Sequence, residues 1–593
     1  MRTPQEIAFR LKQELTNARL FVRPPRLTGT ESEPSPLPSL PDPIAVVARL
    51  RGSEFEREIL TLAQSIRQHR FPLLGLTVDI GPQIQWRRDY VNAKETSLRY
   101  FRRIPYLDRG VCGDHKTIWE LNRHQHLIVL AQAYLFTEDQ GLLDELVGQL
   151  ESWFAQNSFQ RGINWTSALE VAFRALSWMW VYHLVGSRMQ PTFVTRFLEQ
   201  LYLHGRHLEN NLSVYFSPNT HLLGEAVAMH ALGVLFPQFP HAAHWQQLGG
   251  RIVEEQMERQ MRADGSHFEQ SAYYHVYALD MFLFHAVLKP PSARYRDRLT
   301  RMADYLHALF GPARMLPLLG DDDGGRFFHP FGRHECFARA TIATCSRLLD
   351  YADWEYETED LYRQAAWWLG DTGQSRGRGK WTSQLFQDAG IAVLCRGDIH
   401  IVIDAGPFGP WGSGHSHSDT LSLTVRVGER EILIDPGTYT YTDAVWRNLF
   451  RGTAAHNTIR IDGADQAVPV DAFRWKGKPH VRIVRWEATD SEDRIEAECQ
   501  YRGFTHHRSV RFQQPDVLHI RDDISGPPGE HDIEQFWHLG ALQDRERFTF
   551  DGAVEEVEGW RSRAMGQKEP ATVIRLHRRT ELPLRLETTL QLR

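Results

Sequence analysis

The sequence has little cysteine and no surplus of basic charge. Its 593 residues include five cysteines, which are scattered and form no CxxC pair: Cys112, Cys336, Cys345, Cys395 and Cys499. This spacing argues against a disulfide framework and against a cysteine metal site. The formal net charge is −6, whereas domains that bind nucleic acid through bulk charge usually carry a basic surplus. We therefore expect no nucleic-acid partner.

Long apolar runs are also missing. No stretch approaches the roughly 20 apolar residues that span a bilayer, and residues 1–22 mix apolar residues at helical intervals with charges, unlike the apolar core of a signal peptide. We expect a cytoplasmic protein with no membrane partner. Apolar residues make up 42% and charged residues 24%, a globular composition, and the length predicts two or three folded units.

The pattern of apolar residues changes along the chain. Residues 23–43, rich in Pro and Ser, predict an extended connector after a short N-terminal helix. From about 115 to 370 apolar residues recur every three or four positions, which predicts consecutive helical hairpins. The predicted helices span 116–136, 139–156, 167–186, 191–213, 221–236, 242–262, 272–289, 295–310 and 334–352.

After the glycine-rich stretch 370–380 the period shortens to two. Leu421, Leu423 and Val425 alternate with polar residues, as they do in half-buried strands. Further strands are predicted at 391–404, 457–461, 481–488, 494–502, 508–513, 517–521 and 573–577. The sequence thus predicts a multidomain α+β protein with an N-terminal helix and connector (1–43), a helical domain (44–375) and an antiparallel β-sandwich (376–593).

Three polar groups in the helical region could carry chemistry. Asn219 and His221 open an apolar helix, where free backbone N–H groups favour an anion, although simple helix capping is the more common explanation of such residues. Tyr274 belongs to a tyrosine-rich helix, a pattern most often found in amphipathic cores. The acids Asp321–Asp323 lie between glycines, which is typical of a solvated loop and less often of a metal or catalytic site.

The fourth group lies in the strand region. His415 and His417 stand one residue apart in "GHSHSD", and Gly428 with Glu429 offers a turn that would place Asp435 opposite Ser422. Together with His456, two histidines and one aspartate form a ligand set suited to zinc. Unrelated polar residues remain the alternative, and Asp419 has no assigned role.

These phrases together resemble the heparinase II/III family of polysaccharide lyases. The likeness covers "DHKTIWELNRHQHLIVLAQAY", "INWTSALEVAFRALSW" and "DGSHFEQSAYYH" in the helical half, and "GHSHSD", "LIDPGTY" and "FRGTAAHNT" in the strand half. The family implies an incomplete (α/α) toroid followed by an antiparallel β-sandwich. It also implies cleavage of acidic, uronic-acid polysaccharides by β-elimination, with heparin-like substrates first and alginate or hyaluronan as options.

The resemblance also implies residue roles. Asn219 and His415 would hold the uronate carboxylate, which stabilises the enolate-like transition state. Tyr274 would be the general acid and, for one C5 epimer, also the base, which requires a stabilised phenolate because the ordinary tyrosine pKa is about 10. His221 would be the base for the other epimer or a second neutralising group.

Metal and substrate contacts follow from the same resemblance. His417, Asp435 and His456 would bind a structural zinc ion that organises the loop. Residues on the motifs that line the family's cleft would bind substrate, unless they form buried networks between helices: Asn122, Arg123, Asn164, Trp165, Glu170, Arg174 and Glu269. A homodimer is one option for the assembly.

Two other functions fit parts of the sequence. A glycoside hydrolase on a helical toroid would use Glu269 and one of Asp321–Asp323 as acid and base. A carbohydrate-binding protein would keep the cleft without turnover, although the motif tyrosine and histidines are all present. Many members of the family carry an export signal and none is visible here, so we expect action on imported oligosaccharides or in polymer assembly.

Overall fold

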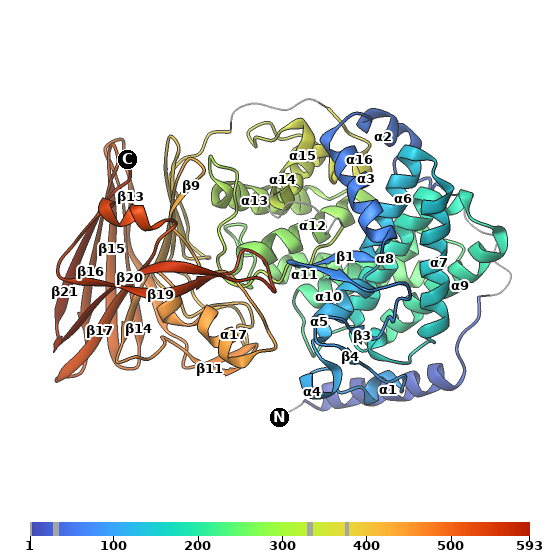
Figure 1. Cartoon of the computed structure of the whole chain (residues 1–593), viewed down its shortest axis with the longest axis horizontal. Helices are drawn as coiled ribbons and strands as arrows, with labels where there is room; N and C mark the ends of the chain where they lie inside the picture. The colour runs from blue at the N-terminus through green and yellow to red at the C-terminus, as the bar shows by residue number, and fades with distance from the viewer. Residues whose placement is uncertain (1–2, 28–34, 329–335, 374–378) are drawn as a thin grey trace.

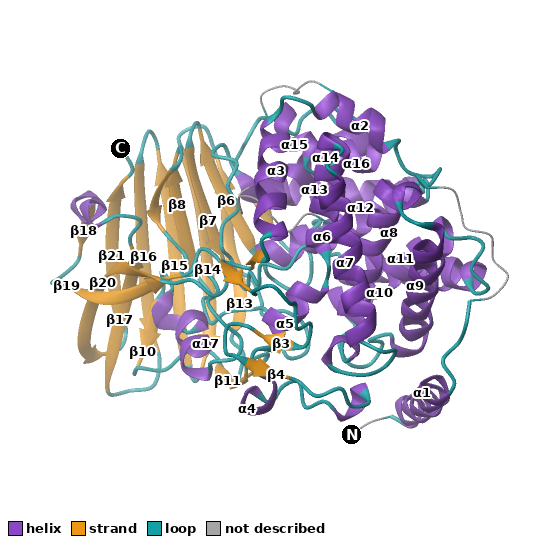
Figure 2. Cartoon of the chain, turned by 45° about the vertical axis from the view of Figure 1, so that its right-hand side comes forward, coloured by secondary structure: helices purple, strands orange, loops and turns teal. Residues whose placement is uncertain are grey.

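The computed structural model describes residues 3–27, 35–328, 336–373 and 379–593. A body of helices and a body of β-sheets lie side by side, and the chain passes from the first to the second (Figures 1 and 2). The predicted change near residue 375 falls within 374–378, outside the described residues, as does part of the predicted connector (28–34). The predicted fold class, a helical toroid followed by an antiparallel sandwich, is confirmed.

The helical body has inner and outer helices. The inner helices are apolar around almost their whole circumference and are buried on all sides: α6 (Gln125–Thr137), α8 (Ala168–Val185), α10 (Thr220–Leu235) and α12 (Ala272–Leu288). The outer helices bury one face and expose charges on the other: α7 (Gln140–Gln156), α9 (Pro191–Asn211), α11 (Ala242–Gln260) and α13 (Ala293–Phe310). Inner and outer helices alternate along the chain, which is the arrangement of an (α/α) toroid.

The remaining helices complete this body. They are α1 (Pro4–Val22), α2 (Pro43–Leu50), α3 (Glu54–Arg67), α4 (Arg109–Cys112), α5 (His115–Asn122), α14 (Cys336–Leu349), α15 (Thr358–Tyr362) and α16 (Ala365–Leu369). The single helix predicted over 116–136 is wrong, because His124 has a positive φ of 59° and separates α5 from α6. Among the described helices, none has the length and apolarity needed to cross a membrane.

The sandwich body holds three larger antiparallel sheets. Their strand orders are β5-β6-β7-β8-β9, β10-β17-β20-β19 and β13-β14-β15-β16-β21-β18. The first comprises β5 (Gln384–Phe386), β6 (Ile391–Arg396), β7 (Ile399–Asp404), β8 (Ser422–Val427) and β9 (Arg430–Leu433). The second comprises Ile459–Ile461 (β10), Glu530–His538 (β17), Glu569–Glu581 (β20) and Val554–Arg561 (β19). The third comprises β13 (His480–Ala488), β14 (Glu492–Tyr501), β15 (Phe504–Gln513), β16 (Val517–Ser525), β21 (Leu584–Gln591) and β18 (Phe548–Phe550).

The first sheet joins the two bodies. Leu394 and Ile401 face the sandwich core, whereas Val393 and Val402 pack against Leu309 of α13. Because both faces are buried, β6 and β7 read as nearly continuous apolar runs rather than as alternating ones. The helical body is therefore fixed to the sandwich by apolar contact, and a site can form between them.

Strand pairing next to the predicted metal site differs from expectation. The turn at Gly428 and Glu429 is confirmed, because Val427 pairs with Arg430. A bulge follows, however, so Val425 pairs with Leu433 and β9 ends there. The predicted pairing of Asp435 with Ser422 is therefore wrong, since the bulge shifts the register by one residue. Helix α17 (Ala444–Arg451), which was not predicted, follows in the chain.

Candidate active site

Asn219 and His221 lie at the N-terminus of α10. The Asn219 side chain caps this helix, because its Oδ1 accepts the His221 N–H at 3.2 Å, while its Nδ2 donates to Glu269 Oε2 at 2.9 Å. The Thr220 N–H donates to Glu269 Oε1 at 3.3 Å, so Glu269 takes the place of an anion at the helix N-terminus. Helix capping by Asn219 is therefore observed, while the Thr220 N–H at the helix N-terminus contacts a carboxyl group of the protein itself.

The imidazole of His221 is half-buried and makes no hydrogen bond among the described residues. Burial lowers its pKa to about 4, and the nearby charge of Glu170 only partly offsets this effect. His221 is therefore neutral near pH 7 and has a nitrogen free to accept a proton.

Tyr274 lies in the first turn of α12, with Ser271 as the capping residue. Its ring stacks on that of His415 with centroids 3.7 Å apart, and its hydroxyl donates to Asp323 Oδ2 at 3.1 Å. Burial, together with the negative charge of Asp323, raises the pKa of Tyr274 well above its ordinary value. Tyr274 is therefore protonated at neutral pH. The environment disfavours the phenolate that the single-residue mechanism requires.

His415 lies between two carboxylates. Its Nδ1 is 3.1 Å from Asp321 Oδ2 and its Nε2 is 3.3 Å from Glu269 Oε2, the same oxygen that Asn219 contacts. Burial disfavours the charged imidazole, but the hydrogen bond to Asp321 and the charge of Glu269 outweigh it, so the pKa of His415 is raised. Asn219 and His415 thus converge on one carboxyl oxygen of Glu269.

In the acidic loop at 321–323, Asp321 and Asp322 are buried and Asp323 is partly buried, so its most frequent interpretation, a solvated loop, is wrong. Asp321 is 0% exposed and is held by Arg447 of α17, whose Nη2 donates at 2.8 Å to Oδ2. Gly320 permits the close approach of this loop to His415, because its φ is +65° and a Cβ there would stand only 2.7 Å from the His415 carbonyl oxygen. The Asp321 N–H donates to that oxygen at 2.9 Å, which fixes the acidic loop against the histidine loop.

Asp323 continues the cluster toward the helical body. Its Oδ2 accepts hydrogen bonds from Tyr274 and, at 2.8 Å, from Lys116 Nζ of α5. Despite burial, the charges of Lys116 and Arg123 lower the pKa of Asp323 below its ordinary value. The tyrosine hydroxyl is therefore aimed by an ionised carboxylate.

His417, Asp435 and His456 come together as a candidate metal site. Their potential ligand atoms all lie within 4.8 Å of one another, and all three residues are buried. His417 Nε2 is 3.0 Å from Asp321 Oδ1 and His456 Nδ1 is 2.8 Å from the Gly452 carbonyl oxygen. A backbone carbonyl oxygen can only accept a hydrogen bond, and the same holds for the Asp321 carboxylate, whose pKa is well below its ordinary value. The protons are therefore assigned to His417 Nε2 and His456 Nδ1.

The two remaining ring nitrogens then present lone pairs to each other. His417 Nδ1 and His456 Nε2 are 3.2 Å apart, and Asp435 Oδ2 is 3.7 Å from His456 Nε2. Ligands bound to zinc at about 2.0–2.1 Å in tetrahedral geometry stand about 3.3 Å apart. Facing lone pairs repel unless a cation lies between them, so the donor set fits a metal ion.

The residues expected to line the cleft divide into two sets. Arg123 and Glu170 form a buried two-pronged ion pair, with Arg123 Nε 2.7 Å from Glu170 Oε2, close to His221 and Asp323. The others lie in a polar network beneath the surface: Asn122, Asn164, Trp165 and Arg174. In that network Arg174 donates to the carbonyl oxygens of Asn122 and Asn164 at 3.2 and 2.9 Å. Their burial favours the alternative of a network between helices.

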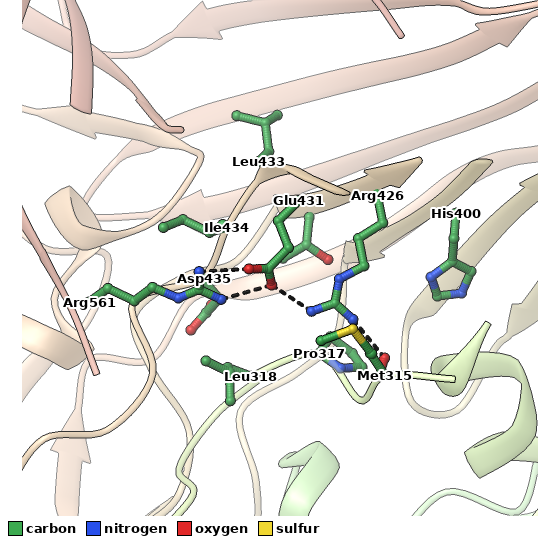
Figure 3. A pocket seen from close by; sticks show the side chains of 11 residues that line it. Met315, Pro317, Leu318, His400, Arg426, Glu431, Leu433, Ile434, Asp435 and Arg561 are labelled. Atoms are coloured by element: carbon green, nitrogen blue, oxygen red, sulfur yellow. Dashed lines mark hydrogen bonds and ion pairs between the residues drawn. The ribbon is translucent and has the colours of Figure 1, made fainter. Parts of the chain in front are cut away.

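A separate pocket opens between the two bodies on the side of Asp435 (Figure 3). Glu431 lies at its centre and accepts hydrogen bonds from Arg426 at 2.5 Å and from Arg561 at 2.8 Å. Apart from Asp435, none of the candidate site residues predicted from the sequence lines this pocket.

Several residues of the site were not assigned from the sequence. Lys116 lies inside a quoted motif, and Asp321 and Asp323 were noted only as a weak possibility. Arg447 and Tyr441 carry no sequence signal, because they enter through a helix and a loop that were not predicted; Arg447 also covers the ring of Tyr441 at 4.7 Å. The glycines around Asp321–Asp323 were the available signal, since they permit the close backbone approach seen at Gly320.

The toroid, the sandwich and the cluster of Asn219, His221, Tyr274 and His415 define the class of toroid-and-sandwich polysaccharide lyases. Family models agree: residues 53–326 match "Heparinase II/III N-terminus" and residues 378–589 match "Heparinase II/III-like, C-terminal". The chain belongs to the heparinase II/III family.

Individual relatives are distant. A heparin-sulfate lyase of Bacteroides stercoris is 23% identical over 498 residues, covering 77% of this chain and 70% of the relative. One of Pedobacter heparinus is 23% identical, covering 67% of this chain and 59% of the relative. Among solved structures, a heparinase III has a TM-score of 0.69 at 17% identity, with 98% of this chain and 90% of the other covered. A mutant heparan sulfate lyase from Pedobacter heparinus has a TM-score of 0.58 at 19% identity, with 99% and 88% covered.

Proposed function

We propose that the chain is a lyase that cleaves heparin- or heparan sulfate-like polysaccharides by β-elimination. The observation that carries this proposal is the convergence of Asn219 and His415 on one carboxyl oxygen, with the Tyr274 ring stacked on that of His415 at 3.7 Å. Two pKa values beside this point are displaced in opposite directions. That of His221 falls to about 4 and that of Tyr274 rises well above 10. Such a separation assigns a base and an acid at neutral pH. The substrate class is taken from relatives that are called heparin-sulfate lyases.

The uronate carboxylate would bind where Asn219 and His415 converge. In the free protein Glu269 Oε2 lies at this point, 2.9 Å from Asn219 Nδ2 and 3.3 Å from His415 Nε2. Burial raises the pKa of Glu269, although the charge of His415 opposes this shift. A protonated Glu269 can share the position by donating a hydrogen bond to the uronate. Three donors then stabilise the negative charge that develops on the carboxylate as C5 loses its proton.

The elimination needs one proton acceptor and one proton donor. His221 takes the proton from C5, the C4–O bond breaks as a C4–C5 double bond forms, and Tyr274 gives its proton to the departing glycosidic oxygen. No water is consumed. The raised pKa of Tyr274 favours this two-residue route over one in which Tyr274 is both base and acid.

The metal site would hold zinc outside the reacting atoms. His417, Asp435 and His456 supply two nitrogens and one oxygen, a set that zinc accepts. All three residues are buried, which fits an ion that fixes the histidine loop. When bound, zinc would supply a rigid crosslink between segments 415–419, 435–437 and 452–456.

The hydrolase alternative is less well supported by the site. Asp321 is fully buried and bound by Arg447, and Asp323 is bound by Lys116, so neither is free to activate water. Glu269 is the remaining acid of the proposed pair, and glycoside hydrolysis uses two carboxyl groups. The site is better equipped to neutralise a carboxylate than to attack a glycosidic carbon.

A substrate panel tests the proposal. Heparan sulfate, heparin, hyaluronan and alginate are each incubated with the protein, and both reducing ends and ultraviolet absorbance are followed. We expect absorbance from a conjugated unsaturated uronate to rise in proportion to reducing ends on heparan sulfate or heparin. Reducing ends without absorbance would replace the lyase by a hydrolase, and absorbance only on alginate or hyaluronan would change the substrate class.

A further inference from the structure

Asp321 touches both halves of the site, the cleft and the candidate metal site. Its Oδ2 accepts from His415 Nδ1 at 3.1 Å, and its Oδ1 accepts from His417 Nε2 at 3.0 Å. One carboxylate therefore contacts the proposed substrate ligand and the proposed metal ligand through different oxygens. Neither oxygen is reachable by solvent, because the side chain is 0% exposed.

The carboxylate cannot easily turn away from either histidine. Arg447 donates to both of its oxygens, and Thr438 Oγ1 donates to Oδ1 at 3.3 Å. A planar guanidinium that grips two oxygens fixes the plane of the carboxylate as well as its position. The backbone is fixed too, through the bond from the Asp321 N–H to the His415 carbonyl oxygen.

The two histidines are also joined through their own loop. Ser416 lies between them, with its N–H bonded to the Ser413 carbonyl at 3.2 Å, and the Ser418 N–H is bonded to the Arg451 carbonyl at 2.8 Å. A cation on His417 Nδ1 polarises the opposite N–H, which strengthens its bond to Asp321 Oδ1. The bond from Oδ2 to His415 belongs to the same carboxylate and responds to that change.

We propose that Asp321 is a positioning residue that couples the metal site to the cleft, so that metal occupancy sets how firmly His415 is held for the uronate. The expected effect of Asp321 on ligand binding through His415 rests on the proposed function, whereas its expected effect on metal binding through His417 does not. Linkage requires the coupling to be reciprocal: if metal strengthens ligand binding, ligand strengthens metal binding by the same factor. A metal that only crosslinks the loops would not need Asp321 for this effect.

Zinc affinity provides the first test, and it needs no substrate. The full chain is stripped with a chelator and titrated with zinc against a colorimetric competitor. We expect Asp321→Asn to weaken zinc binding by about tenfold to hundredfold, the usual effect of losing the partner of a metal-binding histidine. The matched control is Asp322→Asn, the neighbouring buried acid, whose N–H donates to Thr438 Oγ1 and whose Oδ1 accepts the Gly324 N–H. We expect this control to stay within about threefold of the parent. Equal affinities of Asp321→Asn and parent would overturn the inference.

Ligand binding provides the second test. In the Tyr274→Phe background, which should not turn over, a heparan sulfate oligosaccharide is titrated into the zinc-loaded and the stripped protein. We expect at least about fivefold tighter binding with zinc, and loss of that difference when Asp321→Asn is added. A zinc effect that survives in Asp321→Asn would overturn the coupling. No oligosaccharide binding in any form would instead contradict the proposed substrate and leave the zinc titration to decide the effect on metal binding.

A second variant covers the case in which Asp321→Asn does not fold, as judged by circular dichroism. Arg447→Lys keeps the positive charge and removes the two-pronged grip on the carboxylate. We expect it to weaken zinc binding in the same direction by a smaller factor, roughly threefold to tenfold. Unchanged zinc affinity in folded Arg447→Lys would count against a held carboxylate and overturn the inference.

Discussion

Removing one oxygen atom from Tyr274 tests the acid of the proposed mechanism. Tyr274→Phe keeps the ring that stacks on His415 at 3.7 Å and deletes the hydroxyl that donates to Asp323. Asp323 keeps the ammonium of Lys116 at 2.8 Å and the Gly325 N–H at 2.9 Å, so it is not left unpaired. The unfolding free energy should therefore change by no more than about 1.5–3 kcal/mol, the scale of one hydrogen bond to a charged group.

Turnover should respond far more strongly than stability. Loss of a general acid typically costs about 10²- to 10⁴-fold in rate, which equals roughly 3–5 kcal/mol of transition-state stabilisation. Because the carboxylate ligands Asn219 and His415 are untouched, the dissociation constant for an oligosaccharide should stay within about threefold. The assay is initial rate by ultraviolet absorbance, with binding measured by calorimetry.

Tyr277→Phe is the matched control for this experiment. Tyr277 lies one turn further along α12, is buried like Tyr274, and packs beside Phe173 with ring centroids 5.7 Å apart. The turnover rate of the Tyr277→Phe protein should remain within about threefold of the parent rate, because the Tyr277 hydroxyl has no part in the proton transfers. A Tyr274→Phe protein that turns over like the Tyr277→Phe protein would remove Tyr274 from the role of acid.

The other predictions concern Glu269, the base, acid pH and the metal. Glu269→Gln, which keeps a hydrogen-bond donor, should retain at least about a tenth of kcat, and Glu269→Ala about a hundredth or less; equal loss in both variants would contradict a protonated Glu269. The acid limb of kcat/KM should follow His221 and fall near pH 4 rather than near 6.5, in a protein shown to be folded at each pH. Burial lowers the pKa of His126 to about 3 and those of His400 and His538 to about 4, so the unfolded chain binds more protons and stability is lost as pH falls from about 6.5 toward 4. Each should cost about 1.4 kcal/mol at about pH 5.5, so replacing one of them by Gln should reduce the loss of unfolding free energy between about pH 7.5 and 5.5; an equal loss in variant and parent would contradict this. Metal analysis of Asp435→Asn should find clearly less zinc than the parent, and full retention would refute the ligand set.

Much of the fold was predictable because its elements have strong periodicity. The apolar stripes that predicted 191–213 and 272–289 correspond to α9 (Pro191–Asn211) and α12 (Ala272–Leu288). The break at His124 was missed, because a single left-handed residue leaves no trace in an apolar pattern. Strand β17 was missed at 530–538, where polar and apolar residues do not alternate cleanly. The side chains of Gln535 and His538 are buried there, with hydrogen bonds to Asp522 and to the Ala454 carbonyl oxygen.

The candidate site was predictable where a motif carried it. Asn219, Tyr274 and His415 meet within hydrogen-bonding or stacking distance of common partners, although their sequence positions span almost 200 residues. The partners themselves were not predictable. Asp321 and Arg447 are brought together by the docking of α17 against the acidic loop, a long-range event that local pattern does not encode. The pKa directions likewise come from burial, which only the folded chain reveals.

Digestion of heparan sulfate in water enriched in ¹⁸O tests the central claim most directly. Elimination breaks the glycosidic bond without adding water, so the products should absorb in the ultraviolet and carry no ¹⁸O from the cleavage step. Label that exchanges into reducing ends is measured separately on authentic unsaturated oligosaccharides and subtracted. Saturated products with one ¹⁸O for each bond cleaved would show hydrolysis and contradict the account.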